Sequence, residues 1–317
     1  MIRIGISGWI YPGWRGSFYP DGLPQRSDLS FASRRFDTIE INGTFYSLKT
    51  PQSFRRWCQE TPPGFVFAVK GGRFITHMKR LKEVEVPLAN FYASGVLTLG
   101  AKLGPILWQF PADFRLDPEN FTRIERFLGL LPRDTGGAQS LAARHDRRVR
   151  GRAALGPFAP RPIRHALEVR HESFREPRFL DLLRRAGVAL VVSDAPNWPR
   201  FEEVTADFMY LRLHGAEELY RSGYDDKALD RWAKLIRRWA AGGRGAAGKA
   251  RRSPSHNPRP RDVYVYFDND AKVLAPRDAA ALRRRLPGTE RESRGSAGRG
   301  AEFRPAAKAA VRRRSGG

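Results

Sequence analysis

The fold of this chain is decided by the stretch His165-Ala166-Leu167-Glu168-Val169-Arg170-His171-Glu172-Ser173. Read as a β-strand, its side chains alternate between two faces, with Leu167 and Val169 on one and Glu168 and Arg170 on the other. The apolar face is what helices cover in a sheet. A carboxylate and a guanidinium on the opposite face are costly to bury unless they form an ion pair or take part in binding or catalysis. The pattern therefore predicts a strand that forms the floor of a polar site.

Seven further stretches are strand-like, and helix-like stretches separate them. The expected strands are Ile2–Ser7, Thr38–Asn42, Phe65–Lys70, Pro105–Phe110, His165–Arg170, Val188–Ser193, Phe208–His214 and Val263–Asp268. The expected helices are Asp28–Arg35, Gln52–Glu60, Val86–Leu99, Pro118–Leu131, Glu176–Ala186, Asp226–Ala240 and Pro276–Leu286. Only the connection Asp194–Thr205 has no helical pattern. This alternation predicts an α/β protein with a single (β/α)8 barrel of the TIM type over residues 1–287.

The alternation within each strand indicates which side chains face the inside of the barrel. An apolar set faces the helices, and a mixed set lines the interior. The polar members of the mixed set fall at the carboxyl ends of the strands, where such barrels place their chemistry. The side chains expected to gather at this mouth are Glu40, Asn42, Lys70, Gln109, Glu168, Arg170, Asp194, Arg212, His214 and Asp268.

Three cations, Lys70, Arg170 and Arg212, belong to this expected mouth. Arginine forks match the paired oxygens of phosphate and carboxylate groups, so these cations predict an anionic ligand. The alternative is that they neutralise the acidic side chains of the mouth in an internal ion-pair network. The sequence leaves both interpretations open.

Candidate catalytic groups are Glu40 and Glu168 as general bases and His214 as an acid. The same two glutamates would alternatively serve as the carboxylate pair of a glycosidase, whose mechanism depends on their separation. A divalent metal would need histidines and carboxylates that converge from several strands. No HxxxH or CxxC spacing supports such a site, and the nearby arginines oppose a cation, so a metal is not favoured.

Loops after the strands supply further candidates for ligand binding. Trp9, Tyr11 and Trp14 follow the first strand, and they would stack on a base or a sugar ring or, alternatively, pack against the barrel rim. His171 and Asn269 follow later strands and are assigned to the ligand site as well.

The net charge of +24 is unevenly distributed along the chain. Residues 136–163 carry +5, residues 242–261 carry +6, and residues 288–317 carry +5. These stretches are rich in Gly, Ala, Arg and Pro and lack apolar periodicity, which predicts two disordered inserts and a disordered tail. Both inserts connect a helix to the next strand, so barrel geometry places them opposite the mouth. Either genome composition or a nucleic-acid-binding role accounts for their charge.

A series of motifs runs from the first strand to about Leu286 outside the inserts. They are Ser7-Gly8-Trp9, Tyr11-Pro12-Gly13-Trp14-Arg15-Gly16, Phe18-Tyr19-Pro20, Glu40-Ile41-Asn42-Gly43-Thr44-Phe45-Tyr46, Phe67-Ala68-Val69-Lys70, Ile75-Thr76-His77, Gln109-Phe110-Pro111, Glu168-Val169-Arg170-His171-Glu172-Ser173-Phe174, Arg212-Leu213-His214-Gly215 and Tyr266-Phe267-Asp268-Asn269-Asp270. Together these motifs resemble the YecE-like family, a domain of unknown function. The resemblance implies a TIM-type barrel, akin in outline to the endonuclease IV and xylose isomerase barrels. It implies no activity. The inserts and the tail depart from the family pattern.

Cellular location and partners follow from composition. The chain has one cysteine, Cys58, and no apolar run long enough to cross a membrane, which predicts a monomeric cytoplasmic protein with no membrane partner. The leading hypothesis is an enzyme, a hydrolase or lyase, that acts on a small phosphate-bearing or nucleic-acid-derived anion at the mouth. The competing hypothesis is a non-catalytic nucleic-acid-binding barrel.

Overall fold

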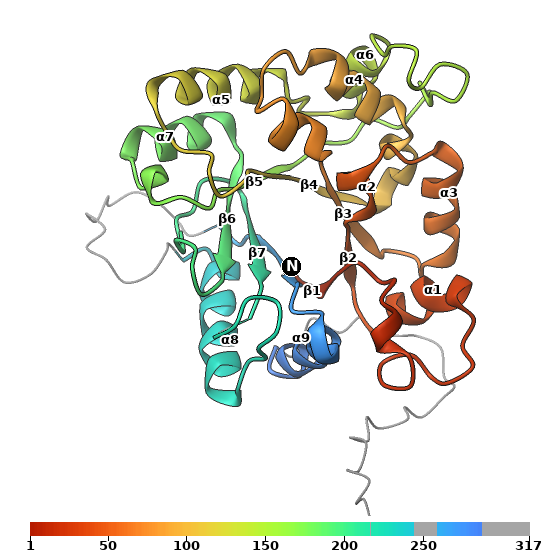
Figure 1. Ribbon diagram of the computed structural model, residues 1–317, viewed down its shortest axis with the longest axis vertical. Coiled ribbons are helices and arrows are strands. Elements are labelled where there is room, and N and C mark those ends of the chain that lie inside the picture. The colour runs from red at the N-terminus through yellow and green to blue at the C-terminus, as the bar shows by residue number, and fades with distance from the viewer. Residues whose placement is uncertain (216, 244–258, 287–317) are drawn as a thin grey trace, which may run out of the picture.

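The computed structural model describes residues 1–215, 217–243 and 259–286. Its eight parallel strands form a closed barrel in chain order, as predicted (Figure 1). The strands are β1 Ile2–Ser7, β2 Thr38–Ile41, β3 Val66–Lys70, β4 Leu103–Gln109, β5 His165–Glu168, β6 Ala189–Asp194, β7 Phe208–Leu213 and β8 Asp262–Phe267. The barrel closes where β1 pairs with β8, in a register that runs from Ile2 opposite Val263 to Ile6 opposite Phe267.

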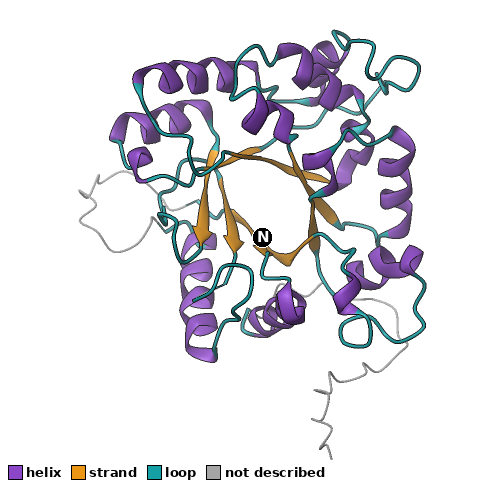
Figure 2. Cartoon of the chain, viewed as in Figure 1, coloured by secondary structure: helices purple, strands orange, loops and turns teal. Residues whose placement is uncertain are grey.

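Helices form the outer layer around the strands (Figure 2). The α-helices of the described residues are α1 Asp28–Ser33, α2 Gly43–Tyr46, α3 Pro51–Glu60, α4 Glu85–Ala93, α5 Pro118–Leu130, α6 Thr135–Ala142, α7 Pro177–Ala186, α8 Asp226–Ala240 and α9 Leu274–Arg284. The connection between β6 and β7 contains no helix, as expected from its sequence. The predicted TIM-type barrel is confirmed.

Two apolar layers hold the barrel together, and the predicted alternation of side chains decides which residues enter each. Leu167 and Val169 of the central stretch belong to the large layer between strands and helices, whereas Ala166 lies inside the barrel. The interior layer consists of Val66, Ala68, Leu107, Ala166, Ala189, Val191, Phe208, Tyr210, Tyr264 and Tyr266. These side chains fill the barrel, so polar chemistry is confined to its carboxyl end.

Side-chain caps fix where the helices after the mouth loops begin. The Asp117 carboxylate accepts a hydrogen bond from the Asn120 backbone N–H at 2.7 Å at the start of α5. Asp225 does the same for Ala228 at 2.7 Å at the start of α8. Such caps satisfy backbone donors that have no partner within the helix. They therefore give each mouth loop a defined end.

The prediction that residues 136–163 form a disordered insert is wrong. The segment contains most of α6, and Ala138, Ala142 and Val149 are fully buried. The Asp134 side chain caps α6 by accepting from the Gly137 N–H at 2.8 Å. The small residues of α6 let this helix pack closely against α4. Alanine and glycine add little to an apolar periodicity, so the sequence pattern does not reveal this contact.

The insert also does not stay on the face opposite the mouth. The Asn90 side chain of α4 exchanges two hydrogen bonds of 3.0 Å with Asp146, one to its carboxylate and one from its backbone N–H. The Arg148 guanidinium then lies 5.8 Å from the ring of Phe74, a residue of the loop that follows β3. The turn of the insert therefore reaches the mouth side of the barrel.

Two predicted features fall outside the described residues. They are most of the second insert, residues 244–258, and the tail, residues 288–317. The domain boundary at residue 287 consequently stays a prediction. In the described part of the chain, no helix is both long and apolar enough to cross a bilayer.

Candidate functional site

Arg212, which β7 directs into the barrel, is the centre of the mouth. Its side chain is fully buried, and each of its five N–H donors has an acceptor. Nε and one Nη2 hydrogen donate to the two oxygens of Glu40 at 3.1 and 3.0 Å, and the other Nη2 hydrogen donates to Asp268 at 2.8 Å. Nη1 donates to Glu168 at 2.9 Å and to Gln109 at 3.4 Å. Arg212 therefore has no donor left for a ligand.

Burial alone would lower the pKa of Arg212, but the carboxylates of Asp268, Glu40 and Glu168 outweigh burial and hold that pKa well above its usual range. The guanidinium is permanently charged. Arg212 therefore takes part in an internal ion-pair network, which is the second of the two interpretations that the sequence leaves open. Its assignment to ligand binding stays a prediction.

Glu40 of β2 is enclosed as completely as Arg212. Besides its two bonds from Arg212, it accepts a hydrogen bond from the Tyr210 hydroxyl at 2.6 Å and another from the Ser7 hydroxyl at 3.1 Å. The side chain has no exposed surface. A general base must come within hydrogen-bond reach of its substrate. The contacts of Glu40 support a role in positioning Arg212, and its predicted role as a general base stays a prediction.

Glu168, the carboxylate of the central stretch, is paired with Arg170 as well as with Arg212. Its Oε1 atom accepts from Arg170 Nε at 3.1 Å, from Arg170 Nη2 at 3.0 Å and from the Ser193 hydroxyl at 3.2 Å. Burial opposes ionisation, but the charges of Arg170 and Arg212 hold the pKa of Glu168 well below its usual range. The fully buried Glu168 is thus an ionised partner of two arginines, and its predicted role as a general base stays a prediction.

Arg170 is held on its other side by an aromatic ring. Its guanidinium carbon lies 3.7 Å from the centre of the Trp198 ring, in the connection between β6 and β7. The side chain is 11% exposed. Arg170 therefore combines an ion pair with a cation–π contact at the edge of the mouth.

His214 lies between two carboxylates. Its Nδ1 atom is 3.1 Å from Asp268 Oδ2, and its Nε2 atom is 3.5 Å from Glu168 Oε1. Neither contact has the angles of a hydrogen bond, so both ring nitrogens of this buried side chain lack a well-formed partner among the described residues. Small movements of the ring would complete either bond, and the predicted role of His214 as a catalytic acid stays a prediction.

Asp268 is the carboxylate of the network that reaches the open side of the mouth. Its side chain is 13% exposed and lines the mouth cavity. Burial opposes ionisation, but Arg212 and His214 hold the pKa of Asp268 below its usual range. Asp268 is therefore an ionised carboxylate within reach of a ligand.

Lys70, at the end of β3, is the cation without a carboxylate partner. No acidic side chain of the described residues lies within ion-pair distance, and its Nζ atom is 4.4 Å from the centre of the Phe45 ring. Burial, and after it the positive charge of Arg212, lowers the pKa of Lys70 to about 8 despite the opposing carboxylates. Of the three predicted ligand-binding cations, Lys70 is the one free to meet an anion.

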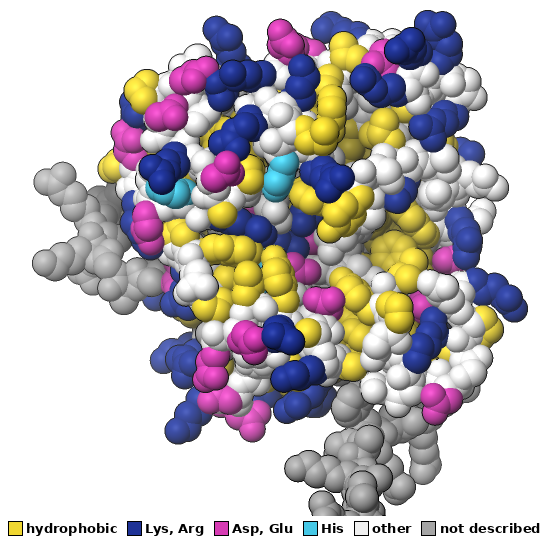
Figure 3. Space-filling view, in the orientation of Figure 1, with side chains coloured by type: hydrophobic (Ala, Val, Ile, Leu, Met, Phe, Trp, Pro, Cys, Tyr) yellow, Lys and Arg dark blue, Asp and Glu magenta, His cyan; other side chains and the backbone are white. Residues whose placement is uncertain are grey.

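A cavity of about 580 Å³ opens above Lys70 and Asp268. Its walls are aromatic and carry both signs of charge, and the named side chains are Trp9, Tyr11, Asn42, Tyr46, Lys49, Trp57, Lys70, Tyr220, Asp268 and Asp270. Figure 3 shows hydrophobic side chains lying between acidic and basic ones over the middle of the barrel. Such a cavity accommodates a ligand that has both a ring and a charged group.

Several predicted ligand contacts have other roles. Trp14 is buried and donates its indole N–H to the Asp270 carbonyl at 3.2 Å, and it packs among aromatic side chains. Asn269 is buried and donates to Asp278 at 2.9 Å and to the Ser222 carbonyl at 3.1 Å. Both side chains are buried and have structural partners, so their assignment to the ligand site stays a prediction that these contacts do not support.

The sequence predicts Asp194 at the mouth, but its side chain points outward from the barrel. It pairs with Arg200 at 3.3 Å and lines a separate cavity against α8. Ser193 is the inward residue there, since the side chains of β6 alternate. His171 accepts a hydrogen bond from the Ser173 N–H at 3.1 Å, which starts the short helix after β5. It does not line the mouth cavity.

Sequence reasoning missed several residues of the site. Among them are Ser7, Ser193, Tyr210, Trp198 and Tyr220. The first three lie on inward strand positions, so the alternation that identified Arg212 also marks them. The other two, Trp198 and Tyr220, come from loops, and nothing in their sequence context indicates that they reach the mouth.

The mouth does not form a metal site in the part of the chain that the structure describes. No three His, Cys, Asp or Glu side chains are grouped there as ligands. The carboxylates of Glu40, Glu168 and Asp268 surround a guanidinium instead, and this arrangement uses the lone pairs that a cation would need.

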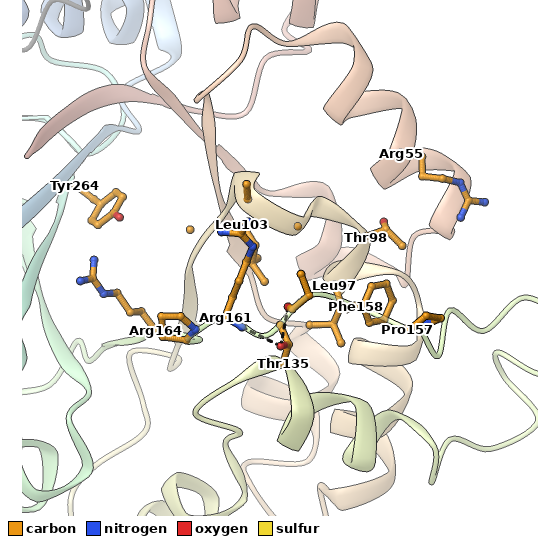
Figure 4. A pocket seen from close by; sticks show the side chains of 15 residues that line it. Arg55, Leu97, Thr98, Leu103, Thr135, Pro157, Phe158, Arg161, Arg164 and Tyr264 are labelled. Atoms are coloured by element: carbon orange, nitrogen blue, oxygen red, sulfur yellow. Dashed lines mark hydrogen bonds between the residues drawn. The ribbon is translucent and has the colours of Figure 1, made fainter.

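A second cavity, of about 450 Å³, lies at the amino end of the barrel (Figure 4). It is lined by Arg55, Arg161, Arg164 and Tyr264. Arg164 is already paired with Asp207 at 3.1 Å and with Asp262 at 2.6 Å. Figure 4 shows the side chains of Arg55 and Arg161 well apart and not converging on one point. The mouth remains the better candidate.

Comparisons with known proteins are consistent with this architecture. Residues 3–299 match the family model described as "Protein of unknown function DUF72". The chain is 31% identical over 128 residues to the UPF0759 protein YunF of Bacillus subtilis and 29% identical over 132 residues to the UPF0759 protein YecE of Escherichia coli K12. These alignments cover 38% and 42% of this chain and only 43% and 45% of the relatives.

Solved structures support the fold. A DUF72 family protein from Thermotoga maritima superposes with a TM-score of 0.68 at 23% identity, covering 90% of this chain and 98% of that one. A DUF72 family protein from Enterococcus faecalis superposes with a TM-score of 0.65 at 16% identity, covering 90% and 95%. At these identities the likeness concerns the fold alone.

Proposed function

Because this chain belongs to the DUF72 family of proteins of unknown function, its activity has to be inferred from the mouth, and we propose that it is an enzyme acting on an anionic, phosphate-bearing ligand there. The family assignment confirms the resemblance to YecE-like proteins. The observation that carries the proposal is Lys70, a buried cation that faces the cavity without a carboxylate. An unpaired buried charge is costly unless it is used.

The cavity suits a ligand that has both an anionic group and a ring. The Lys70 ammonium would meet a phosphate or carboxylate, and the rings of Trp9, Tyr11 and Tyr220 would pack against a base or a sugar. A volume of about 580 Å³ suits a molecule of nucleotide or sugar-phosphate size.

The proposed chemistry uses Asp268 as a general base and Lys70 as a general acid. Asp268 is ionised and accepts a proton from the ligand or from water, while Lys70, with a pKa of about 8, donates one to a leaving oxygen. His214 lies behind Asp268, with its Nδ1 atom 3.1 Å from Asp268 Oδ2, and would hold this carboxylate in position. This set of roles fits hydrolysis or elimination, and it assigns the predicted base to Asp268 in place of Glu40 and Glu168.

Thermal unfolding in added inorganic phosphate tests the proposal. A ligand that binds only the folded protein raises its melting temperature, so phosphate should stabilise the wild type and not Lys70→Met. Lys227→Met removes the same charge from the exposed face of α8 and should respond like the wild type. Equal stabilisation of Lys70→Met and wild type would show that Lys70 does not bind the phosphate, and this result would contradict the proposed function.

A further inference from the structure

Exposed apolar side chains gather on the loops after β2 and β3. Tyr46 is 67% exposed, Met78 is 66% exposed and Phe74 is 39% exposed, which is unusual for large side chains so close together. Together with Arg73 and Arg148 we call these residues the rim track. Exposed apolar groups in such a patch mark a binding surface more often than scattered ones do.

Both exposed rings of the rim track are accompanied by an arginine. The Arg73 guanidinium lies 5.6 Å from the centre of the Tyr46 ring, and the Arg148 guanidinium lies 5.8 Å from that of Phe74. Arg73 has no carboxylate partner among the described residues, whereas Arg148 is paired with Asp146 at 2.7 Å. Aromatic rings beside arginines are the means by which proteins bind single-stranded nucleic acids, since every base has a face to stack.

Aromatic rings connect the rim track to the cavity. Tyr46 lines the cavity, and its ring lies 5.2 Å from that of Phe45, which contacts Lys70. The centre of the His77 ring also lies 5.0 Å from that of Phe45. Burial, together with the charges of Arg170 and Lys70, lowers the pKa of His77 to about 4, so this ring is uncharged at neutral pH. Ring contacts thus run from Lys70 through Phe45 to the exposed ring of Tyr46.

The insert extends this row with positive charge. Its turn beside Phe74 carries arginines whose side chains are exposed, and these are Arg144, Arg147, Arg150 and Arg152. Arg147 and Arg150 have no carboxylate partner among the described residues. Asp146 is the one acidic residue between positions 136 and 163. Exposed arginines next to stacking rings provide contacts for a phosphate backbone.

We propose that the rim track and the insert bind a single-stranded nucleic acid whose end or displaced nucleotide enters the mouth cavity. The cavity part of this inference rests on the proposed function, because the entering phosphate would meet Lys70. A duplex does not fit the proposal, since its bases are stacked on one another and cannot reach Tyr46 and Phe74.

The stacking part is tested by fluorescence anisotropy with a labelled 12-nucleotide oligothymidylate and the full chain. Tyr46→Ala with Phe74→Ala should raise Kd about tenfold, as expected for the loss of base stacking. Tyr46→Phe with Phe74→Tyr keeps both rings and should bind like the wild type. Melting temperatures of both variants check folding. Unchanged affinity of the alanine variant, or equally tight binding of a duplex, would overturn the inference.

The charge part is tested by the salt dependence of the same binding. Arg147→Gln with Arg150→Gln should reduce the slope of log K against log salt by about 1.4, which corresponds to two lost phosphate contacts on a single strand. Arg126→Gln with Arg185→Gln removes the same charge from exposed positions on α5 and α7 and should leave the slope unchanged. Equal reductions in the two variants would show that binding follows net charge alone, against the inference.

The outcomes separate this inference from the proposed function. If the oligonucleotide fails to bind while phosphate still stabilises the wild type through Lys70, the rim-track inference is wrong and the proposed function stands. If the oligonucleotide binds through the rings but phosphate acts equally on Lys70→Met, the proposed enzyme role is wrong and the rim track remains a nucleic-acid-binding surface.

Discussion

Arg212 and Arg170 end near the same carboxylate, yet their surroundings differ. Arg212 is fully buried and donates to three carboxylates, whereas Arg170 is 11% exposed and donates to Glu168 alone. Removing the guanidinium of Arg212 would leave Glu40, Glu168 and Asp268 facing one another. Removing that of Arg170 would leave Glu168 with one cation. Burial and the number of carboxylate partners therefore predict that Arg212 contributes more to stability than Arg170.

We expect Arg212→Met to lower the free energy of unfolding by roughly 3–5 kcal/mol, because breaking a buried ion pair leaves uncompensated charges. Arg170→Met should lose less than half as much, since Arg212 still compensates Glu168. Urea unfolding of the three proteins measures both losses. Adding Glu168→Gln to Arg170→Met should recover part of the smaller loss. Equal stability of Arg212→Met and wild type would contradict a structural network.

His165 shows how a buried histidine is kept neutral. Its Nδ1 atom accepts from the Trp108 indole N–H at 3.2 Å, and its Nε2 atom lies 2.8 Å from the Pro132 carbonyl, to which it donates. Burial lowers the pKa of His165 to about 4. The unfolded chain binds this proton near pH 6.5 and the folded protein does not, so stability is lost as pH falls from 6.5 towards 4.

The His165 contribution to this loss should be roughly 3 kcal/mol, given about 1.4 kcal/mol for each unit of pKa. We expect His165→Gln to be less stable at pH 7.5 but to lose less stability between pH 6.5 and pH 4 than the wild type. Urea unfolding at several pH values measures this. A wild-type protein that becomes more stable as the pH falls from 6.5 to 4 would contradict the predicted direction of this pH dependence.

At the scale of an element, α6 and the turn after it change what the first insert does. Their buried side chains pack on α4, and Arg148 brings positive charge to Phe74. A segment that lacks apolar periodicity can still be ordered when small residues permit close helix packing and a cap begins the helix. The insert is thus part of the outer layer of the barrel.

Replacing residues 136–160 with a short Gly/Ser linker should lower the free energy of unfolding by at least roughly 2 kcal/mol. The linker would uncover α4 and remove the burial of Ala138, Ala142 and Val149. Urea unfolding provides the measurement, and the m-value shows whether the folded state lost only this segment. Unchanged stability would indicate that the packing against α4 contributes nothing.

At the scale of the whole molecule, closure of the barrel brings together groups that are far apart in sequence. Glu40 and Arg212 are separated by 172 positions, and their hydrogen bonds exist because every strand ends at the same mouth. Acid should therefore weaken the whole barrel. Glu168 and Asp268 have folded-state pKa values below their ordinary ones, so their contribution is present above the unfolded pKa and is lost as pH falls through the folded pKa.

The sequence by itself determined the barrel, the inward and outward faces of its strands, and the gathering of Glu40, Glu168, Arg212 and Asp268 at one end. These features follow from a period of two residues and from the order of strands and helices, and both are local properties of the chain. Only the tertiary structure decided that Arg212 is saturated and Lys70 is free, that Asp194 points outward, and that the first insert folds against α4. Each of these depends on which groups from distant strands and helices come within a few ångströms of one another, and the closed barrel sets those distances.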